Sequence, residues 1–186
     1  MPQYKADATG RSTFQLARSK DKESANPWPN ESFIRLGITL LQSAAYRTLS
    51  LAAKNVLDRI MIEHLSHAGR INGKLPCTYS DFERHGVRRQ SVAKALDELQ
   101  ALGFIELIRR GHLRPEGESG SPSLYKLTFE SVNLPDRVVA ATHEWKRFAT
   151  IEQCTNAKLA FHASHKSERS QKFSRSMNRK IQKSSV

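Results

Sequence analysis

A short segment of the chain gathers side chains that suit the recognition of nucleic acid. Arginine makes paired hydrogen bonds to guanine, glutamine makes them to adenine, and lysine and serine bind phosphate oxygens. Apolar residues follow at three- and four-residue steps, which predicts a helix over residues 88–102 with these side chains in its first two turns. The candidate contacts are Arg88, Arg89, Gln90, Ser91 and Lys94.

Two acidic residues limit how much of this helix can face a polyanion. Asp97, on the predicted solvent face, and Glu98 beside it would repel phosphate. We therefore expect only the first two turns of the helix to enter a groove. The alternative interpretation is an ordinary solvated helix face.

A second, shorter helix is predicted just before the first. Thr78 and Asp81 have the spacing of a capping box, and Gly86 ends the segment. A glycine between two helices provides a corner where φ can be positive, as a helix-turn-helix requires. Thr78 and Tyr79, which open the short helix, complete the predicted contacts from this pair.

Two β-segments follow, at residues 104–110 and 123–129, with a loop rich in Gly, Pro and Ser between them. Basic side chains at the start of that loop could follow a phosphate backbone or reach a minor groove. Two glutamates in the loop dilute this charge, and the alternative is an ordinary hairpin. The candidate contacts here are Arg109, Arg110, His112 and Arg114.

The segment before the helix pair predicts another helix and a short strand. The main part of the helix begins after Ser50 as N-cap and ends at Gly69. An Asn72–Gly73 turn and a β-segment over residues 74–77 follow. The predicted fold class is therefore α+β, mainly α with a small β-hairpin wing: a winged helix-turn-helix.

Charge and composition divide the chain into four parts. The net charge is +12, and residues 146–186 carry +8 of it, which favours a polyanionic partner. We expect a flexible polar arm at residues 1–32, the winged domain at 33–130 and a helical extension at 131–150. We expect a disordered basic tail at 151–186. Trp145 and Phe148 in the extension fit either packing on the domain or dimerisation.

The sequence gives little indication of metal binding or catalysis. The pairs His64–His67 and His162–His165 lack the further ligands that a metal site needs, and the chain has no recognisable catalytic motif. We therefore expect no enzyme, no cofactor and no small-molecule ligand. Two distant cysteines, the absence of a secretory signal and the absence of a long apolar stretch predict a cytoplasmic, nucleoid-associated protein without a membrane partner.

The block NGKLPCTYSDFERHGVRRQSVAKALDELQALGFIEL, together with LYKLTF downstream, resembles the winged helix-turn-helix modules of small bacterial DNA-binding proteins. These include MarR- and GntR-type regulators and plasmid replication initiators. The closest resemblance is to a largely uncharacterised group with a TYxDF…G…LGFIE pattern, found in bacterial genomes and mobile elements. It covers roughly residues 33–148 and is specific for the fold rather than for the biological role.

The residues and the resemblance together predict sequence-specific binding of double-stranded DNA, in a transcriptional regulator that is either a monomer or a homodimer. One alternative is a replication or recombination accessory protein of a plasmid or mobile element. A second is an RNA- or anionic-surface-binding protein driven by the basic tail.

Overall fold

The computed structural model describes residues 32–112 and 120–165. All of them belong to one compact unit that begins at Ser32. The polar arm expected at residues 1–32 lies outside the described residues except for Ser32, and so do Arg114 and the tail beyond residue 165.

Three helices open the described chain, and side-chain caps define two of them. α1 (Ile38–Leu41) leads into α2 (Ala44–Arg47), where the Ser43 hydroxyl accepts a hydrogen bond from the Tyr46 N–H. α3 (Leu51–Ser66) begins as expected at Ser50, whose hydroxyl accepts from Ala53 N at 3.2 Å. It ends before Gly69, which has a φ of +70°. α1 was not predicted from the sequence.

The next segment contains the two helices around Gly86. After β1 (Leu75–Cys77), α4 (Tyr79–Arg84) starts with the complete capping box of Thr78 and Asp81. α5 (Arg89–Ala101) follows after a turn in which Gly86 has a φ of +86°. The capping box and the positive φ at this glycine are therefore confirmed.

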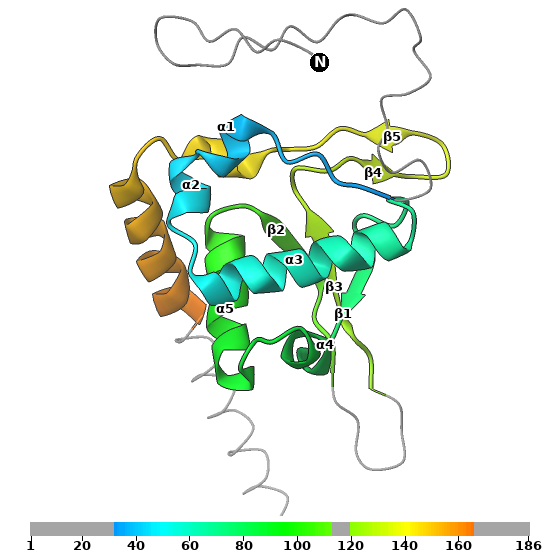
Figure 1. Ribbon diagram of the computed structural model, residues 1–186, viewed down its shortest axis with the longest axis horizontal. Coiled ribbons are helices and arrows are strands. Elements are labelled where there is room, and N and C mark those ends of the chain that lie inside the picture. Colours follow the sequence, from blue (N-terminus) through cyan, green and yellow to red (C-terminus); the bar gives the residue numbers. More distant parts are fainter. Residues whose placement is uncertain (1–31, 113–119, 166–186) are drawn as a thin grey trace, which may run out of the picture. The chain divides into compact units, whose positions relative to one another are not determined.

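A small antiparallel sheet completes the centre of the fold. β2 (Ile105–Arg109) and β3 (Ser123–Leu127) pair as the expected hairpin, and β3 also pairs with β1, so the strand order is β1–β3–β2. α3 contacts β1, β3 and α5, while α5 contacts β2 (Figure 1). The α+β class is thus confirmed.

The hydrophobic core lies where α3 and α5 meet the sheet. The expected core stripe of α5 is buried, with Val92 and Leu99 fully enclosed and Leu96 6% exposed. Val56, Ile60 and Phe82 are likewise fully buried. None of the helices within residues 32–112 and 120–165 is both long and apolar enough to cross a membrane.

The chain after the sheet differs from the prediction. Residues 131–150 do not form the expected helical extension: they contain β4 (Val132–Asn133), β5 (Val138–Val139) and a single 3-10 turn, η1 (Glu144–Arg147). Trp145 in that turn is 5% exposed and belongs to the core, as the packing interpretation required.

The start of the predicted disordered tail is also different, because residues 151–165 are helical (Figure 1, orange). Cys154 of this helix is completely buried, and the Lys158 ammonium donates to the Thr48 carbonyl at 2.7 Å. Burial of a cysteine and a long-range hydrogen bond stabilise a helix whose composition alone favours disorder.

Two glycines with positive φ provide a matched test of this local geometry. A Cβ at Gly86 would have no atom within 4 Å, whereas a Cβ at Gly103 would lie 2.7 Å from Glu144 Cβ. We expect Gly86→Ala to cost about 1 kcal/mol of unfolding free energy, from backbone strain alone. Gly103→Ala should cost at least about 2 kcal/mol, because steric overlap adds to the strain. Urea denaturation of both variants measures this, and equal losses would contradict the steric contribution at Gly103.

Candidate nucleic-acid interface

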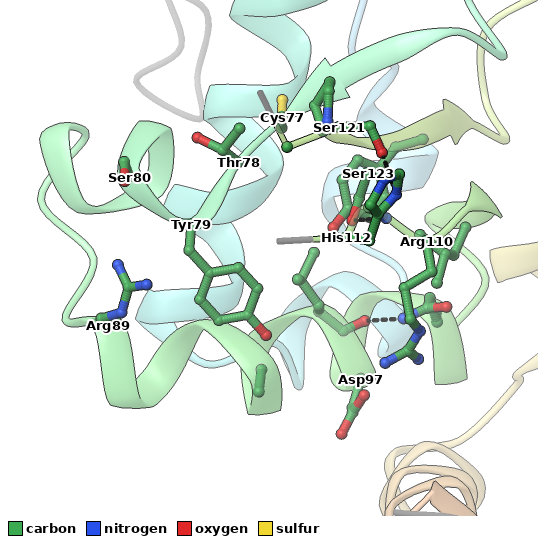
Figure 2. Close-up of a pocket in the computed structure, with 18 residues that line it drawn as sticks. Cys77, Thr78, Tyr79, Ser80, Arg89, Asp97, Arg110, His112, Ser121 and Ser123 are labelled. Atoms are coloured by element: carbon green, nitrogen blue, oxygen red, sulfur yellow. Dashed lines mark hydrogen bonds between the residues drawn. The ribbon is translucent and has the colours of Figure 1, made fainter. Parts of the chain in front are cut away.

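Residues predicted as DNA contacts in three separate segments surround one surface pocket. Its volume is about 560 Å³, and it lies between the start of α4, one face of α5 and the β2–β3 hairpin. Figure 2 shows the Tyr79 ring between Arg89 on one side and Arg110 and His112 on the other. The predicted contacts that line the pocket are Thr78, Tyr79, Arg89, Arg110 and His112.

The capping box holds the α4 side of the pocket in place. The Asp81 carboxylate accepts hydrogen bonds from the backbone N–H and the hydroxyl of Thr78, both at 2.7 Å, and pairs with Arg84. Burial by itself would raise the pKa of Asp81, but these hydrogen bonds outweigh it and lower the pKa. Asp81 therefore remains ionised at neutral pH and keeps Thr78 and Tyr79 at the pocket edge.

The remaining predicted contacts of α5 lie outside the pocket. Arg88 is the N-cap residue, and Arg88, Gln90 and Lys94 are exposed, while Ser91 is half-buried. Gln90 and Lys94 are four positions apart and so share one face of the helix. Within the described residues, none of these three exposed side chains has a hydrogen bond or ion pair, which leaves them available to a ligand.

Arg89 differs from its neighbours because an acidic side chain already binds it. Its guanidinium donates to the Glu83 carboxylate at 2.6 Å and lies 5.8 Å from the centre of the Tyr79 ring. No helical repeat predicts this pair, because the turn at Gly86 lies between Glu83 near the end of α4 and Arg89 at the start of α5. A phosphate that binds Arg89 has to compete with Glu83.

The acidic residues of α5 are placed differently from the expectation. Asp97 and Glu98 were expected to repel phosphate, but they are only 5% and 9% exposed. Glu98 accepts a hydrogen bond from the Ser50 N–H at 3.1 Å, and Asp97 lies 3.4 Å from the His162 ring nitrogen of the 151–165 helix. The second half of α5 is therefore covered by other parts of the chain, and its first two turns are the accessible part.

A β-bulge sets the direction of the hairpin arginines. Leu107 pairs with Tyr125 and Arg109 pairs with Leu124, so Ile108 is an additional residue in β2. Because a bulge interrupts the alternation of side chains along a strand, both Leu107 and Arg110 line the pocket, whereas Arg109 does not. The sequence predicts a contact from each of these two arginines and does not distinguish between them.

The end of the hairpin at the pocket rim is tightly packed. The Gly111 N–H donates to the Ser123 hydroxyl at 2.9 Å, and the His112 ring lies 2.7 Å from the Ser121 hydroxyl. A Cβ at Gly111 would lie 2.6 Å from the Ser123 nitrogen. Gly111 is therefore required by the close approach of the two strands beside Arg110 and His112.

Replacing Gly111 tests whether the hairpin belongs to the DNA interface. We expect Gly111→Ala to weaken DNA binding at least about tenfold, because displacement of the strands moves Arg110 and His112, whose charged contacts are each worth about 1.5–3 kcal/mol. Electrophoretic mobility shifts measure the binding, and thermal melting serves as the fold control. Wild-type affinity in a folded Gly111→Ala protein would exclude the hairpin from the interface.

Two residues that line the pocket have strongly raised pKa values. Burial raises the pKa of the Cys77 thiol to about 12, and it also raises the pKa of Tyr125 to about 12, although Ser123 and Arg110 partly oppose the shift at the tyrosine. Both groups therefore remain protonated and uncharged at neutral pH.

The histidine pairs of the sequence have local roles. His64 is 3% exposed at the end of α3, where burial lowers its pKa, and His165 stacks on Phe161 at 4.1 Å between ring centres. In residues 32–112 and 120–165, no group of three or more His, Cys, Asp or Glu could hold a metal ion.

One basic residue of the expected tail makes a hydrogen bond within the fold. Lys158 belongs to the basic tail whose charge predicts a polyanionic partner, but its ammonium donates to the Thr48 carbonyl and its side chain is half-buried. The tail cations beyond residue 165, like Arg114, lie outside the described residues.

Comparison with known proteins adds no assignment, since no protein-family model, no curated protein and no solved structure matches the chain.

Proposed function

We propose that this chain binds double-stranded DNA through a winged helix-turn-helix, with α4 and α5 as the helix pair and the β2–β3 hairpin as the wing. The convergence of predicted contacts from three separate segments, the start of α4, the start of α5 and the hairpin, around one surface pocket carries the proposal. The order α3–β1–α4–α5–β2–β3 and the strand order β1–β3–β2 support it. The surplus of twelve positive charges supports a polyanionic partner.

In this mechanism the first two turns of α5 enter the major groove. Gln90 hydrogen-bonds to a base edge, Lys94 on the same helix face binds a base edge or a phosphate, and Arg88 binds a phosphate from the N-cap position. Arg110 and His112 of the hairpin contact the backbone, which positions the protein without reading sequence. The role is that of a transcriptional regulator in the cytoplasm, acting by occlusion or recruitment at a promoter.

Gln90 and Lys94 separate base reading from phosphate binding. We expect Gln90→Ala to reduce the binding free energy by about 1–3 kcal/mol on a duplex obtained by in vitro selection. The reduction on random DNA should be much smaller. We expect Lys94→Ala to weaken binding to both duplexes by similar factors. It should also reduce the slope of log affinity against log salt concentration by about one unit. Salt titrations with both duplexes measure these effects.

The matched control is Gln42→Ala, an exposed glutamine at the end of α1 that should change neither quantity. Equal losses on cognate and random duplexes for Gln90→Ala would remove this residue from base reading. Absence of any salt-dependent duplex binding by the full chain would refute the proposed function.

The same assays distinguish the remaining roles. A selected palindrome indicates a dimer, and footprints on origin or attachment-site repeats favour a replication or recombination accessory protein. Preference for RNA or for anionic vesicles over duplex DNA at equal salt would instead favour binding driven by the basic tail.

A further inference from the structure

One cation of the candidate interface is paired within the protein itself. The Arg89 Nη1 donates to the Glu83 carboxylate at 2.6 Å, across the turn at Gly86. The Gly86 N–H donates in turn to the Glu83 carbonyl at 2.9 Å, which fixes the backbone of Glu83 close to the start of α5. Arg88 and Lys94 differ from Arg89, because neither makes a hydrogen bond or an ion pair within the described residues.

The pair leaves Arg89 with hydrogen-bond donors but with little net charge. Because the two opposite charges are in contact, the attraction of a phosphate to the guanidinium is offset by its repulsion from the carboxylate. The hydrogen bond to Glu83 uses Nη1, so Nε and Nη2 remain available to donate. A guanine edge presents O6 and N7, which are both uncharged acceptors, to such donors. The paired arginine is therefore better suited to a base edge than to a phosphate.

The Tyr79 ring restricts the same side chain. The guanidinium carbon of Arg89 lies 5.8 Å from the centre of this ring (Figure 2), within the range of a cation–π contact. The Arg89 side chain is nevertheless 60% exposed, and the Glu83 side chain is 37% exposed. A duplex can thus reach the remaining nitrogens of Arg89. A side chain that is already held in place also loses less conformational entropy when it binds.

We propose that Glu83 is a specificity-determining residue, which withholds Arg89 from phosphates and reserves it for a guanine in the cognate site. This role rests on the proposed DNA-binding function. Glu83 acts through Arg89 and does not itself contact the duplex. The unpaired cations of the interface, Arg88 among them, supply the attraction to phosphates.

Replacing Glu83 by glutamine removes the charge and keeps an oxygen that can accept from Arg89. We expect Glu83→Gln to raise the affinity for random duplex DNA about threefold to tenfold, because Arg89 becomes free to bind a phosphate. The slope of log affinity against log salt concentration should steepen by about one unit. Affinity for a duplex obtained by in vitro selection should change little, so the ratio of the two affinities should fall. Fluorescence anisotropy over a salt series measures these quantities with the full chain.

The matched control is Glu106→Gln. It removes the same charge from a carboxylate that is 49% exposed and pairs with Lys126 at 2.7 Å. Glu106 lies in β2 and does not line the pocket, so this variant should change neither the salt slope nor the affinity ratio. Circular dichroism of each variant checks that the fold is retained.

Arg89→Gln then shows which acceptor Arg89 binds. In the wild-type background this substitution should lower the affinity for the selected duplex about tenfold and leave the salt slope unchanged. In the Glu83→Gln background it should reduce the slope by about one unit. Replacing the contacted guanine by 7-deazaguanine, which lacks N7, should remove most of the effect of Arg89→Gln in the wild-type background.

Two outcomes would overturn the role of Glu83 in a chain that binds duplex DNA. The first is an unchanged salt slope together with an unchanged affinity ratio in Glu83→Gln, as expected if the pair is merely structural. The second is a slope reduced by about one unit for Arg89→Gln in the wild-type background, which would mean that Arg89 binds a phosphate despite Glu83. Both leave the proposed function standing. Absence of salt-dependent duplex binding by the wild-type chain would instead refute the proposed function, and the role of Glu83 with it.

Discussion

Replacing Asn72 by Leu is expected to lower the free energy of unfolding by about 3–5 kcal/mol, since each buried polar group left unpaired costs about 1–3 kcal/mol. The Asn72 amide N–H₂ donates to the carbonyls of Leu127, Glu130 and Ser131. Its carbonyl oxygen accepts from the N–H groups of Leu127 and Gly73. Leucine occupies a similar volume but satisfies none of these groups.

The Asn72 amide hydrogen-bonds the chain before β1 to the end of β3. Loss of these hydrogen bonds should therefore also destabilise the sheet. Urea denaturation followed by circular dichroism measures it. The control is Asn133→Ala, because Asn133 is exposed and makes one long hydrogen bond, at 3.4 Å to Gly69. We expect this control to change stability by less than about 0.5 kcal/mol. A loss below 1 kcal/mol for Asn72→Leu would show that water replaces the amide.

Asn72→Asp distinguishes lost donors from lost packing. The aspartate retains an acceptor for Leu127 and Gly73 but faces three carbonyl oxygens without a proton to donate when it is ionised. Those carbonyls disfavour the charged form, so the pKa of the aspartate should be raised in the folded state. A group with a raised folded pKa gains stability as the pH falls, and therefore the variant should be less destabilised at pH 4 than at pH 7.

Phe104→Ala is expected to destabilise the protein by about 3–5 kcal/mol, as removal of a fully buried phenylalanine leaves a large cavity. Phe104 is completely buried between α5 and β2, and its ring meets Tyr46 of α2 edge-on at 6.0 Å. Its carbonyl also accepts a hydrogen bond from the Thr128 N–H at 3.1 Å. The cavity would therefore lie where the helix pair, the sheet and the N-terminal helices meet.

The matched control for this prediction is Phe33→Ala, because the Phe33 side chain is 54% exposed. It should cost less than about 1 kcal/mol, since little apolar area returns to water. Calorimetric melting of both variants is the measurement. Comparable losses for the two phenylalanines would mean that Phe104 is not enclosed in solution.

Local features of this protein were readable from the sequence because they depend on residues within one helical turn of each other. The caps at Ser50 and Thr78 involve atoms three residues apart, and positive φ at Gly86 follows from the absence of a Cβ. The buried stripe of α5 follows from the helical repeat. The α+β class and both strands of the central hairpin could be predicted in the same way.

Some strand and turn segments escaped prediction because their sequence signal is weak. β4 and β5 have two residues each, too few for an alternating pattern. The bulge at Ile108 leaves no mark in composition, yet it determines that Arg110 rather than Arg109 reaches the pocket. In the candidate site, residue types were therefore predictable, but the directions of the side chains were not.

Contacts between distant segments were decided only by the tertiary structure. The sequence alone shows a glutamate in α4, an acidic pair in α5 and a basic stretch after residue 150. Folding pairs Glu83 with Arg89, turns Glu98 to the N–H of Ser50, and places the 151–165 helix beside Asp97. These pairings join residues that are 6, 48 and 65 positions apart, and short-range periodicity contains no information about the chain paths that bring them together. The sequence therefore determined which side chains could bind a polyanion, and the packing of the helices determined which of them remain exposed to do so.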